Sequence, residues 1–209
     1  IIFIEYICNK NMNKDLQELL KLFNEKKYSI AEKKCWNLIK KINPNYEVFN
    51  IYAVILFELK KYNEAIKYWK KAIELNPKYQ FGYNNLGNVY FKKNEFKEAL
   101  GYYEKAIQIN PNYYEAFYNQ GNVFKEINNF PKAIECFDKA LKIKADYLPA
   151  LKSRSDIYVK QKNFKKALSE LDKILIYDSD NIKTYIQKAD ILCQENNLRE
   201  GLENYKMRT

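Results

Sequence analysis

The most informative absence in this chain of 209 residues is histidine, which does not occur at all. Catalysis by a histidine acid or base and zinc sites with histidine ligands are therefore excluded. Four cysteines, Cys8, Cys35, Cys136 and Cys193, lie far apart, and no two of them form a CxxC pair. This pattern argues against a disulfide framework, and we expect unpaired thiols in a reducing, cytoplasmic compartment.

Glycine, proline and long apolar runs are also scarce. Five Gly and five Pro are too few for an all-β protein with many tight turns. No stretch approaches the ~20 apolar residues that span a bilayer, so we expect no membrane span. Lys, Glu, Leu and Ala, which are good helix formers, are abundant. The composition therefore predicts an all-α fold.

Arginine is rare although the net charge is +10. Only three of the 36 basic residues are Arg (Arg154, Arg199 and Arg208). Nucleic-acid-binding proteins favour Arg because its planar guanidinium group contacts phosphates and guanine edges with two hydrogen bonds at once. The chain is also rich in Asn, Ile, Tyr and Phe. Like Lys, these residues are specified by AT-rich codons. Composition bias therefore explains much of the basicity, and nucleic-acid binding is kept only as a minor alternative.

Sequence motifs of catalysis are missing as well. There is no Gly-rich phosphate loop, no nucleophile elbow and no cluster with metal-ligand spacing. Carboxylates such as Glu64, Glu98 and Glu200 fall at expected helix starts, where the helix dipole favours negative charge. We therefore predict that the chain alone is not an enzyme. We expect no catalytic, metal-binding or cofactor-binding residues, no cofactor and no small-molecule substrate.

The sequence does contain a clear period of about 34 residues, which is the interval from Ala31 to Ala65. Small, aromatic and large apolar residues each return at this spacing, and Asn-Pro closes three of the periods at Pro44, Pro77 and Pro111. The recurrent alanines are Ala31, Ala65, Ala99, Ala133 and Ala167, preceded by the aromatics Tyr62, Phe96, Phe130 and Phe164. The upstream small residues are Ala53, Gly87, Gly121, Ser155 and Ala189, followed by Leu56, Tyr90, Phe124, Tyr158 and Leu192.

Each period has the pattern of two amphipathic helices of about 14 residues, separated by a polar break such as KKN, INN or QKN. We expect the small residue of the first helix to face the recurrent alanine of the second helix. A further small residue in the second helix should let the next repeat pack closely (Ala72, Ala106 and Ala140). Asparagines in the breaks are expected to take the left-handed conformation that ends a helix (Asn94, Asn129, Asn163 and Asn197).

These recurrences resemble the tetratricopeptide repeat family. Its pattern W-x2-L-G-x2-Y, then A-x3-F, then A and P, is similar to residues 83–111 at Tyr83, Leu86, Gly87, Tyr90, Ala99, Tyr103, Ala106 and Pro111. The resemblance implies an α-α superhelix, a right-handed solenoid of antiparallel helix pairs with the first helices on its concave side. The repeats are expected at residues 12–45, 46–79, 80–113, 114–147 and 148–181, with a partial repeat at 182–209. For the extension at residues 1–11, the alternatives are a longer helix, an exposed strand and non-native upstream sequence.

The resemblance also implies a site. In similar proteins, the second, fifth, sixth, ninth, twelfth and thirteenth places of a repeat can face the concave groove. These places contain many asparagines, and we expect them to project into open groove, where neutral amides bind the backbone of an extended peptide. Phe57 and Phe91, at the twelfth place, are candidate apolar contacts at the edge of the groove. The predicted groove residues are Asn50, Asn84, Asn85, Asn88, Tyr118, Asn119, Asn122, Lys125, Lys152 and Asp156.

Three interpretations of function follow. The leading one is a non-catalytic scaffold that binds a peptide or partner protein in its groove. Asn85 and Asn119 occupy places similar to the groove asparagines of the O-linked N-acetylglucosamine transferase superhelix. Proteins that this repeat class resembles often carry such arrays ahead of glycosyltransferase or sulfotransferase domains, so a second interpretation is the recruiting arm of a larger enzyme of that type. RNA binding is the third. The asparagines could equally be solvated residues in an Asn-rich chain.

Overall fold

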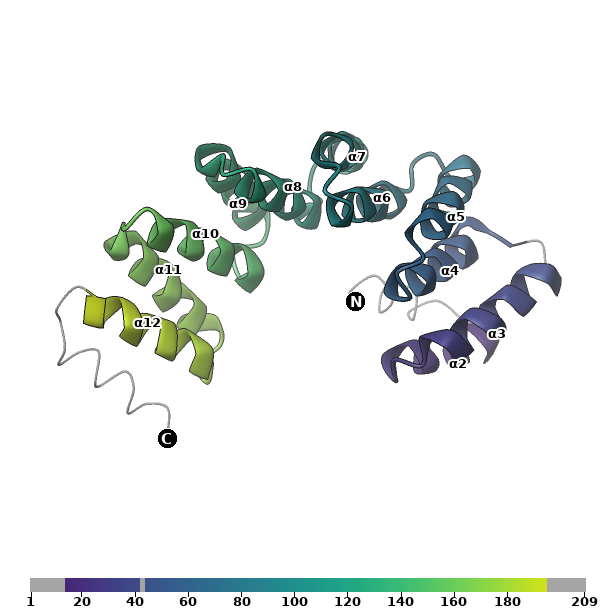
Figure 1. The fold of residues 1–209 in the computed structure, drawn as a ribbon, viewed down its shortest axis with the longest axis horizontal. Coiled ribbons are helices and arrows are strands. Elements are labelled where there is room, and N and C mark those ends of the chain that lie inside the picture. The colour runs from purple at the N-terminus through teal and green to yellow at the C-terminus, as the bar shows by residue number, and fades with distance from the viewer. Residues whose placement is uncertain (1–13, 42–43, 195–209) are drawn as a thin grey trace. The chain divides into compact units, whose positions relative to one another are not determined.

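The described residues of the computed structural model, 14–41 and 44–194, are all-helical, with eleven helices and no strand among them. The expected all-α fold class is confirmed for these residues. The helices follow one another as neighbouring pairs joined by short connections (Figure 1). Their bounds are α2 (Lys14–Asn24), α3 (Tyr28–Lys41), α4 (Tyr46–Glu58), α5 (Tyr62–Leu75), α6 (Gln80–Lys92), α7 (Phe96–Ile109), α8 (Tyr114–Glu126), α9 (Phe130–Ile143), α10 (Leu148–Lys160), α11 (Phe164–Tyr177) and α12 (Ile182–Gln194).

The helices begin at the spacing that the sequence shows. The helices α4, α6, α8, α10 and α12 each start one full period after the one before, and so do α3, α5, α7, α9 and α11. The chain divides into two compact parts, here called the N-terminal half (residues 1–111) and the C-terminal half (residues 112–209). In the N-terminal half α3 packs on α4 and α5 on α6, and in the C-terminal half α9 packs on α10 and α11 on α12.

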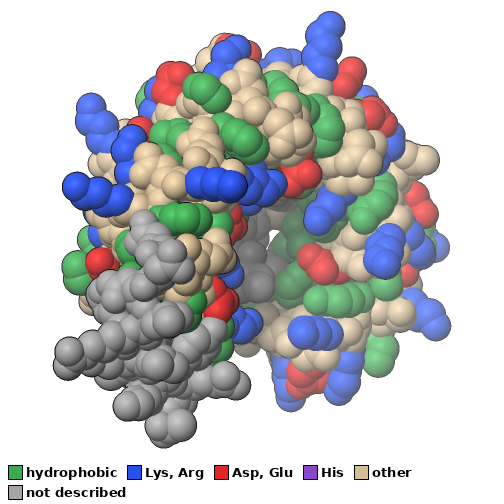
Figure 2. All heavy atoms as spheres, turned by 60° about the vertical axis from the view of Figure 1, so that its left-hand side comes forward, with side chains coloured by type: hydrophobic (Ala, Val, Ile, Leu, Met, Phe, Trp, Pro, Cys, Tyr) green, Lys and Arg blue, Asp and Glu red, His purple; other side chains and the backbone are tan. Residues whose placement is uncertain are grey.

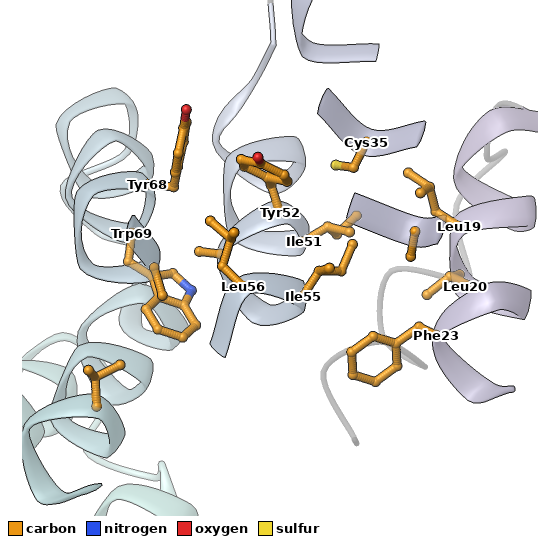
Figure 3. Close-up of a cluster of buried hydrophobic side chains, with 14 of the residues drawn as sticks. Leu19, Leu20, Phe23, Cys35, Ile51, Tyr52, Ile55, Leu56, Tyr68 and Trp69 are labelled. Atoms are coloured by element: carbon orange, nitrogen blue, oxygen red, sulfur yellow. The ribbon is translucent and has the colours of Figure 1, made fainter. Parts of the chain in front are cut away.

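The core of the N-terminal half lies between α2, α3, α4 and α5. Leu19 and Phe23 of α2 and Cys35 of α3 are buried with the apolar face of α4 and with Trp69 of α5 (Figure 3). Tyr52 of α4 lies edge-on to Tyr68 of α5, with 4.7 Å between ring centroids. Tyr52, Tyr68 and Trp69 are therefore packed into the core.

The turn between the two helices of a pair contains one residue with positive φ. The last turns of the first helices carry the two hydrogen bonds of a Schellman motif; after α4, for example, Lys61 N–H donates to the Leu56 carbonyl and Lys60 N–H to the Phe57 carbonyl. The residues with positive φ are Lys26, Lys60, Asn94, Asn128 and Lys162, with φ between 56° and 61°. They recur once per period, like the helices that they connect.

The left-handed conformation expected for the asparagines in these breaks is confirmed at Asn94 and wrong at Asn129 and Asn163. Asn129 and Asn163 have negative φ and precede α9 and α11 as N-caps. Their side chains accept hydrogen bonds from the backbone N–H groups of Lys132 and Lys166, respectively, at 3.3 Å. An amide oxygen at the N-cap satisfies a helix donor that would otherwise have no partner, which explains the asparagine at this place. Asn197 lies outside the described residues.

The small residue of the first helix accommodates an aromatic ring in two repeats. A Cβ atom on Gly87 would lie 2.5 Å from Cε1 of Tyr103, and a Cβ atom on Gly121 would lie 2.5 Å from Cε1 of Phe137. The expected contact with the recurrent alanine is found in the next repeat, where Ser155 Oγ donates to the Ala167 carbonyl at 3.3 Å. At the two glycines, the atoms nearest to an added Cβ belong to a ring, so the ring limits the size of the residue at this place.

Arg154 connects three helices of the C-terminal half. From α10 it donates through Nε and NH2 to Oε2 of Glu170 on α11, at 3.2 and 2.5 Å, and through NH1 to Asp138 on α9. The Glu170 side chain is buried, at 7% exposure. Two hydrogen bonds to one carboxylate compensate part of the free-energy cost of burying these charges.

Candidate functional site

The predicted groove residues all lie on first helices of the pairs. Asn50 belongs to α4, Asn84, Asn85 and Asn88 to α6, four others to α8, and Lys152 and Asp156 to α10. The first four lie in the N-terminal half and the remaining six in the C-terminal half.

Two of the asparagines do not project into open space as expected. Asn50 is 0% exposed and Asn84 is 6% exposed. Both stand at the fifth place of their repeats, on the side of the first helix that packs against the core. The expectation of open, solvated amides is therefore wrong for these two residues, whereas Asn85 and Asn88 on the neighbouring turn are half-buried.

Asn50 links the core to the wall of the site. Its Oδ1 accepts one hydrogen bond from Trp69 Nε1 at 2.9 Å and a second from Asn85 Nδ2 at 3.1 Å. An indole nitrogen can only donate, so the Asn50 atom that faces Trp69 must be the oxygen. The Asn85 atom that faces this oxygen must then be its nitrogen. Trp69 thus fixes the orientation of both amides.

Asn88 is oriented by a second buried ring. The hydroxyl of Tyr103 on α7 donates to Asn88 Oδ1 at 2.8 Å. Burial raises the pKa of Tyr103, so its hydroxyl keeps the proton that it donates. Since Oδ1 is engaged by Tyr103, Asn88 has its amide hydrogens left to offer to a ligand.

Asn85 and Asn88 are brought together in the wall of a pocket in the N-terminal half. Its volume is about 320 Å³. We call it the Trp69 pocket, and its wall combines apolar side chains with the two asparagine amides. It is lined by Phe23, Asn24, Lys26, Tyr28, Val54, Phe57, Glu58, Trp69, Asn85 and Asn88. Phe57, expected at the edge of the groove, is part of this wall.

A second pocket, of about 490 Å³, lies in the C-terminal half. It brings together Tyr118, Lys152 and Asp156 of the predicted site. Asp156 accepts from Gln187 Nε2 at 3.2 Å, and Lys125 Nζ lies 4.0 Å from its other oxygen. The other lining residues are Leu148, Pro149, Ser153, Ile174, Asn181, Lys183, Thr184 and Gln187. Asn119 and Asn122, the equivalents of Asn85 and Asn88, are half-buried on α8.

Several residues of the pockets were not singled out from the sequence. Phe23 stands at the twelfth place of the first repeat and Lys183 at the second place of the sixth, so the groove places applied to every repeat would have found both. Lys26, Tyr28 and Glu58 lie in the turns between helices or at the helix ends beside them. No periodic signal in the sequence assigns turn residues to the site.

Within residues 14–41 and 44–194, no group of three or more Cys, Asp or Glu side chains could hold a metal ion. Among the described helices, none is both long enough and apolar enough to span a membrane. The three described cysteines, Cys35, Cys136 and Cys193, are unpaired.

Comparison with known families matched two sets of residues. A family model described as "Tetratricopeptide repeat" matches residues 81–113 and 114–147, and one described as "TPR repeat" matches residues 54–94. No curated protein sequence matched the chain significantly.

Solved structures are similar to the chain over most of its length. PilF of Pseudomonas aeruginosa has a TM-score of 0.77 and 16% identity, covering 91% of this chain and 86% of its own. MamA has a TM-score of 0.66 and 23% identity, covering 82% and 98%. YrrB, described as a TPR protein with an unusual peptide-binding site, has a TM-score of 0.60 and 20% identity, covering 83% and 90%. The chain therefore contains tetratricopeptide repeats, matched over residues 54–147, and has an all-α fold of the α-α superhelix class.

Proposed function

We propose that the chain is a non-catalytic scaffold that binds an extended peptide segment of a partner protein along the first helices of its repeats. One observation carries this proposal: sixth- and ninth-place side chains line a pocket in each half. In the N-terminal half these are Asn85 and Asn88, and in the C-terminal half Ser153 and Asp156.

The chemistry of these places suits a peptide. Asparagine amides carry no charge and can both donate and accept hydrogen bonds, as a peptide backbone does. Tyr118 and Lys152 add apolar area and a positive charge in the C-terminal half. The peptide-binding site named in the description of YrrB supports the proposal by analogy of fold alone. The similarity of the groove to that of O-linked N-acetylglucosamine transferases stays a prediction.

The surface charge favours protein over nucleic acid as the partner. On the face shown in Figure 2, Lys and Arg side chains are interspersed with acidic and apolar ones and form no single patch. Several lysines are engaged in ion pairs, such as Lys61 with Glu32 at 2.6 Å and Lys188 with Asp172 at 2.6 Å. Nucleic-acid binding usually depends on a continuous basic surface.

A display library of random peptides, screened against the intact chain, tests the proposal. The chain should select peptides, and Asn85→Ala combined with Asn119→Ala should weaken their binding at a temperature where the variant is fully folded. Asn85 is half-buried, and its loss leaves the Trp69–Asn50 hydrogen bond in place. The matched control is Asn63→Ala with Gln161→Ala, which removes one exposed amide in each half. Selection of no peptide, or equal binding by the double variant, would retire the proposal.

A further inference from the structure

The Trp69 pocket has a polar and an apolar part. Phe23 of α2, Val54 and Phe57 of α4, and the indole of Trp69 supply apolar wall, and Asn85 and Asn88 supply amides from α6. Lys26 and Glu58 are exposed residues of opposite charge that also line it. Because these charges balance, the pocket favours neither an acidic nor a basic group.

The two amides offer one acceptor and one donor. Asn85 Nδ2 donates a hydrogen bond to Asn50 Oδ1, and the Oδ1 atom of Asn85 accepts no hydrogen bond from the described residues. Asn88 Oδ1 accepts a hydrogen bond from the Tyr103 hydroxyl, and Asn88 Nδ2 makes no hydrogen bond to the described part of the chain. Residues three apart lie on the same face of a helix, so the acceptor and the donor are neighbours.

This pair is complementary to one residue of an extended peptide. A backbone N–H can donate to Asn85 Oδ1, and a backbone C=O can accept from Asn88 Nδ2. The side chain of that residue then has the apolar wall to fill. A volume of about 320 Å³ is at the lower end of the roughly 300–1,000 Å³ of small-ligand sites, which suits one large side chain.

The orientation of Asn85 is maintained at a cost in stability. Asn50 Nδ2 is buried, and none of the described residues accepts a hydrogen bond from it. An unsatisfied buried donor lowers the stability of the folded state. A leucine at this place would avoid the cost, but it would leave both Trp69 and Asn85 without their acceptor. The arrangement therefore leaves one buried donor unsatisfied and provides an oriented amide in the pocket wall.

We propose that the Trp69 pocket binds one large apolar side chain, of the size of Phe or Leu, from an extended segment of a partner protein. The backbone of that residue is held by Asn85 and Asn88. This inference rests on the proposed function and adds the class of residue that the N-terminal half selects. It differs from a ladder of equivalent amides that ignores peptide sequence.

The chain contains its own reporter for this site. Its two tryptophans are Trp69, in the pocket wall, and Trp36, on α3 and more exposed, at 36%. Indole N–H resonances of the intact, ¹⁵N-labelled chain can be assigned with Trp36→Phe. The probes are capped tripeptides of the form Gly-Xaa-Gly, with Phe, Leu, Gly, Lys or Glu as the central residue.

We expect the Phe and Leu peptides to shift the Trp69 resonance and to leave the Trp36 resonance in place. The Gly, Lys and Glu peptides should bind about tenfold more weakly or worse, because they cannot bury a large apolar side chain. Equal affinity for Phe and Gly peptides would overturn the inference. So would a preference for the Lys or Glu peptide.

Two variants test the parts of the site. Asn88→Asp keeps the acceptor for Tyr103 and removes the amide donor, so it should weaken the Phe peptide about tenfold. Asn63→Asp makes the same chemical change at an exposed place on α5 and should leave affinity unchanged. Val54→Phe fills the pocket with another apolar group and should abolish the Trp69 shift without unfolding the chain, as far-ultraviolet circular dichroism would verify. Full binding by Val54→Phe would contradict the inference.

The outcomes separate this inference from the proposed function. If library peptides bind the chain while the Trp69 resonance does not shift, the proposed scaffold function is supported and the inference about the apolar pocket is overturned. If neither library peptides nor tripeptides bind, both fail. A third outcome concerns the chain's own apolar N-terminal residues. If Phe3→Ser alone shifts the Trp69 resonance in the absence of peptide, the occupant is that segment, and the partner peptide is overturned.

Discussion

The indole of Trp69 and the amide of Asn50 are joined by a hydrogen bond of 2.9 Å between α4 and α5, and both side chains are almost completely buried, at 2% and 0% exposure. The bond connects the packing of the core to the orientation of Asn85, which shares the same acceptor. Stability and the geometry of the pocket therefore depend on one oxygen atom.

The first prediction concerns that bond. Asn50→Ala should lower the free energy of unfolding by about 2 kcal/mol, because the Trp69 N–H is left buried without an acceptor. Urea unfolding followed by far-ultraviolet circular dichroism measures the change. Trp69→Phe removes the donor, so adding it to Asn50→Ala should cost less than the sum of the single changes. Strictly additive losses would show that the two side chains are not coupled.

The second prediction compares two helical glycines. Gly87→Ala should destabilise the chain by roughly 1–2 kcal/mol, since its Cβ would lie 2.5 Å from the Tyr103 ring and overpack the pair α6–α7. Gly101→Ala on α7 should stabilise it by about 1 kcal/mol, because a Cβ there meets nothing within 4 Å and alanine is the better helix former. Thermal melting of both variants provides the measurement. A stabilising Gly87→Ala would refute the ring contact.

The third prediction concerns the turns. Lys162 has φ of 56°, which costs an L-residue roughly 1–2 kcal/mol and costs glycine almost nothing. Lys162→Gly should therefore raise the midpoint of thermal unfolding. Lys160→Gly, at the last residue of α10, should lower it because glycine is a poorer helix former than lysine. Changes of the same sign in both variants would contradict the assignment of the turn.

The fourth prediction is a loss of stability in alkali. Burial raises the pKa of Cys35 from 9.0 to about 12, and burial with a hydrogen bond to Glu115 raises the pKa of Tyr114 from 10.0 to about 12. Burial also shifts the pKa of Tyr52 and Tyr147 upward. Above their ordinary pKa values the unfolded state releases protons that the folded state retains, so stability falls as pH rises.

For each group the free energy of unfolding declines by up to about 1.4 kcal/mol per pH unit above its unfolded pKa, and the stabilisation is complete below pH ~9. Melting temperatures measured from neutral pH to pH ~12 should therefore drop most steeply above pH ~10. The absorbance of tyrosinate should rise together with the loss of helix. Tyrosine ionisation well before unfolding would show that these rings are not protected.

Periodicity explains how much of the fold could be predicted. Alanines that recur once per period, such as Ala65 and Ala99, reveal the helix spacing because each repeat packs on its neighbours through the same places. The places that face the site follow from that register only together with the resemblance to tetratricopeptide repeats, which implied Asn85 and Asn88 as groove residues. The left-handed residue of each turn was misplaced by one position at Asn128 and Lys162. Asparagine is favoured both at N-caps and at positions with positive φ, so its presence alone does not distinguish the two. In these turns Asn129 and Asn163 are the N-caps of α9 and α11, and the preceding residue has the positive φ.

Other features depend on pairing across helices, which a single sequence does not reveal. The burial of Asn50 requires Trp69 to face it from α5, and a tryptophan at that place looks like an ordinary core residue. The contact between Gly87 and Tyr103 likewise depends on side-chain direction rather than on spacing. Arg154 was noted for its rarity, but its bonds to Glu170 and Asp138 depend on the packing of three helices.

The glycine–ring contacts have a consequence for how such a chain can lengthen. Both contacts lie within a single repeat: Gly87 pairs with Tyr103, and Gly121 pairs with Phe137. The small residue and the ring that it accommodates are therefore encoded in the same repeat. Duplication of a whole repeat copies both partners at once and creates no steric conflict. A crossover inside a repeat can instead place a ring opposite a residue that has a Cβ atom. Gene events that respect the period are therefore the ones that preserve these two contacts.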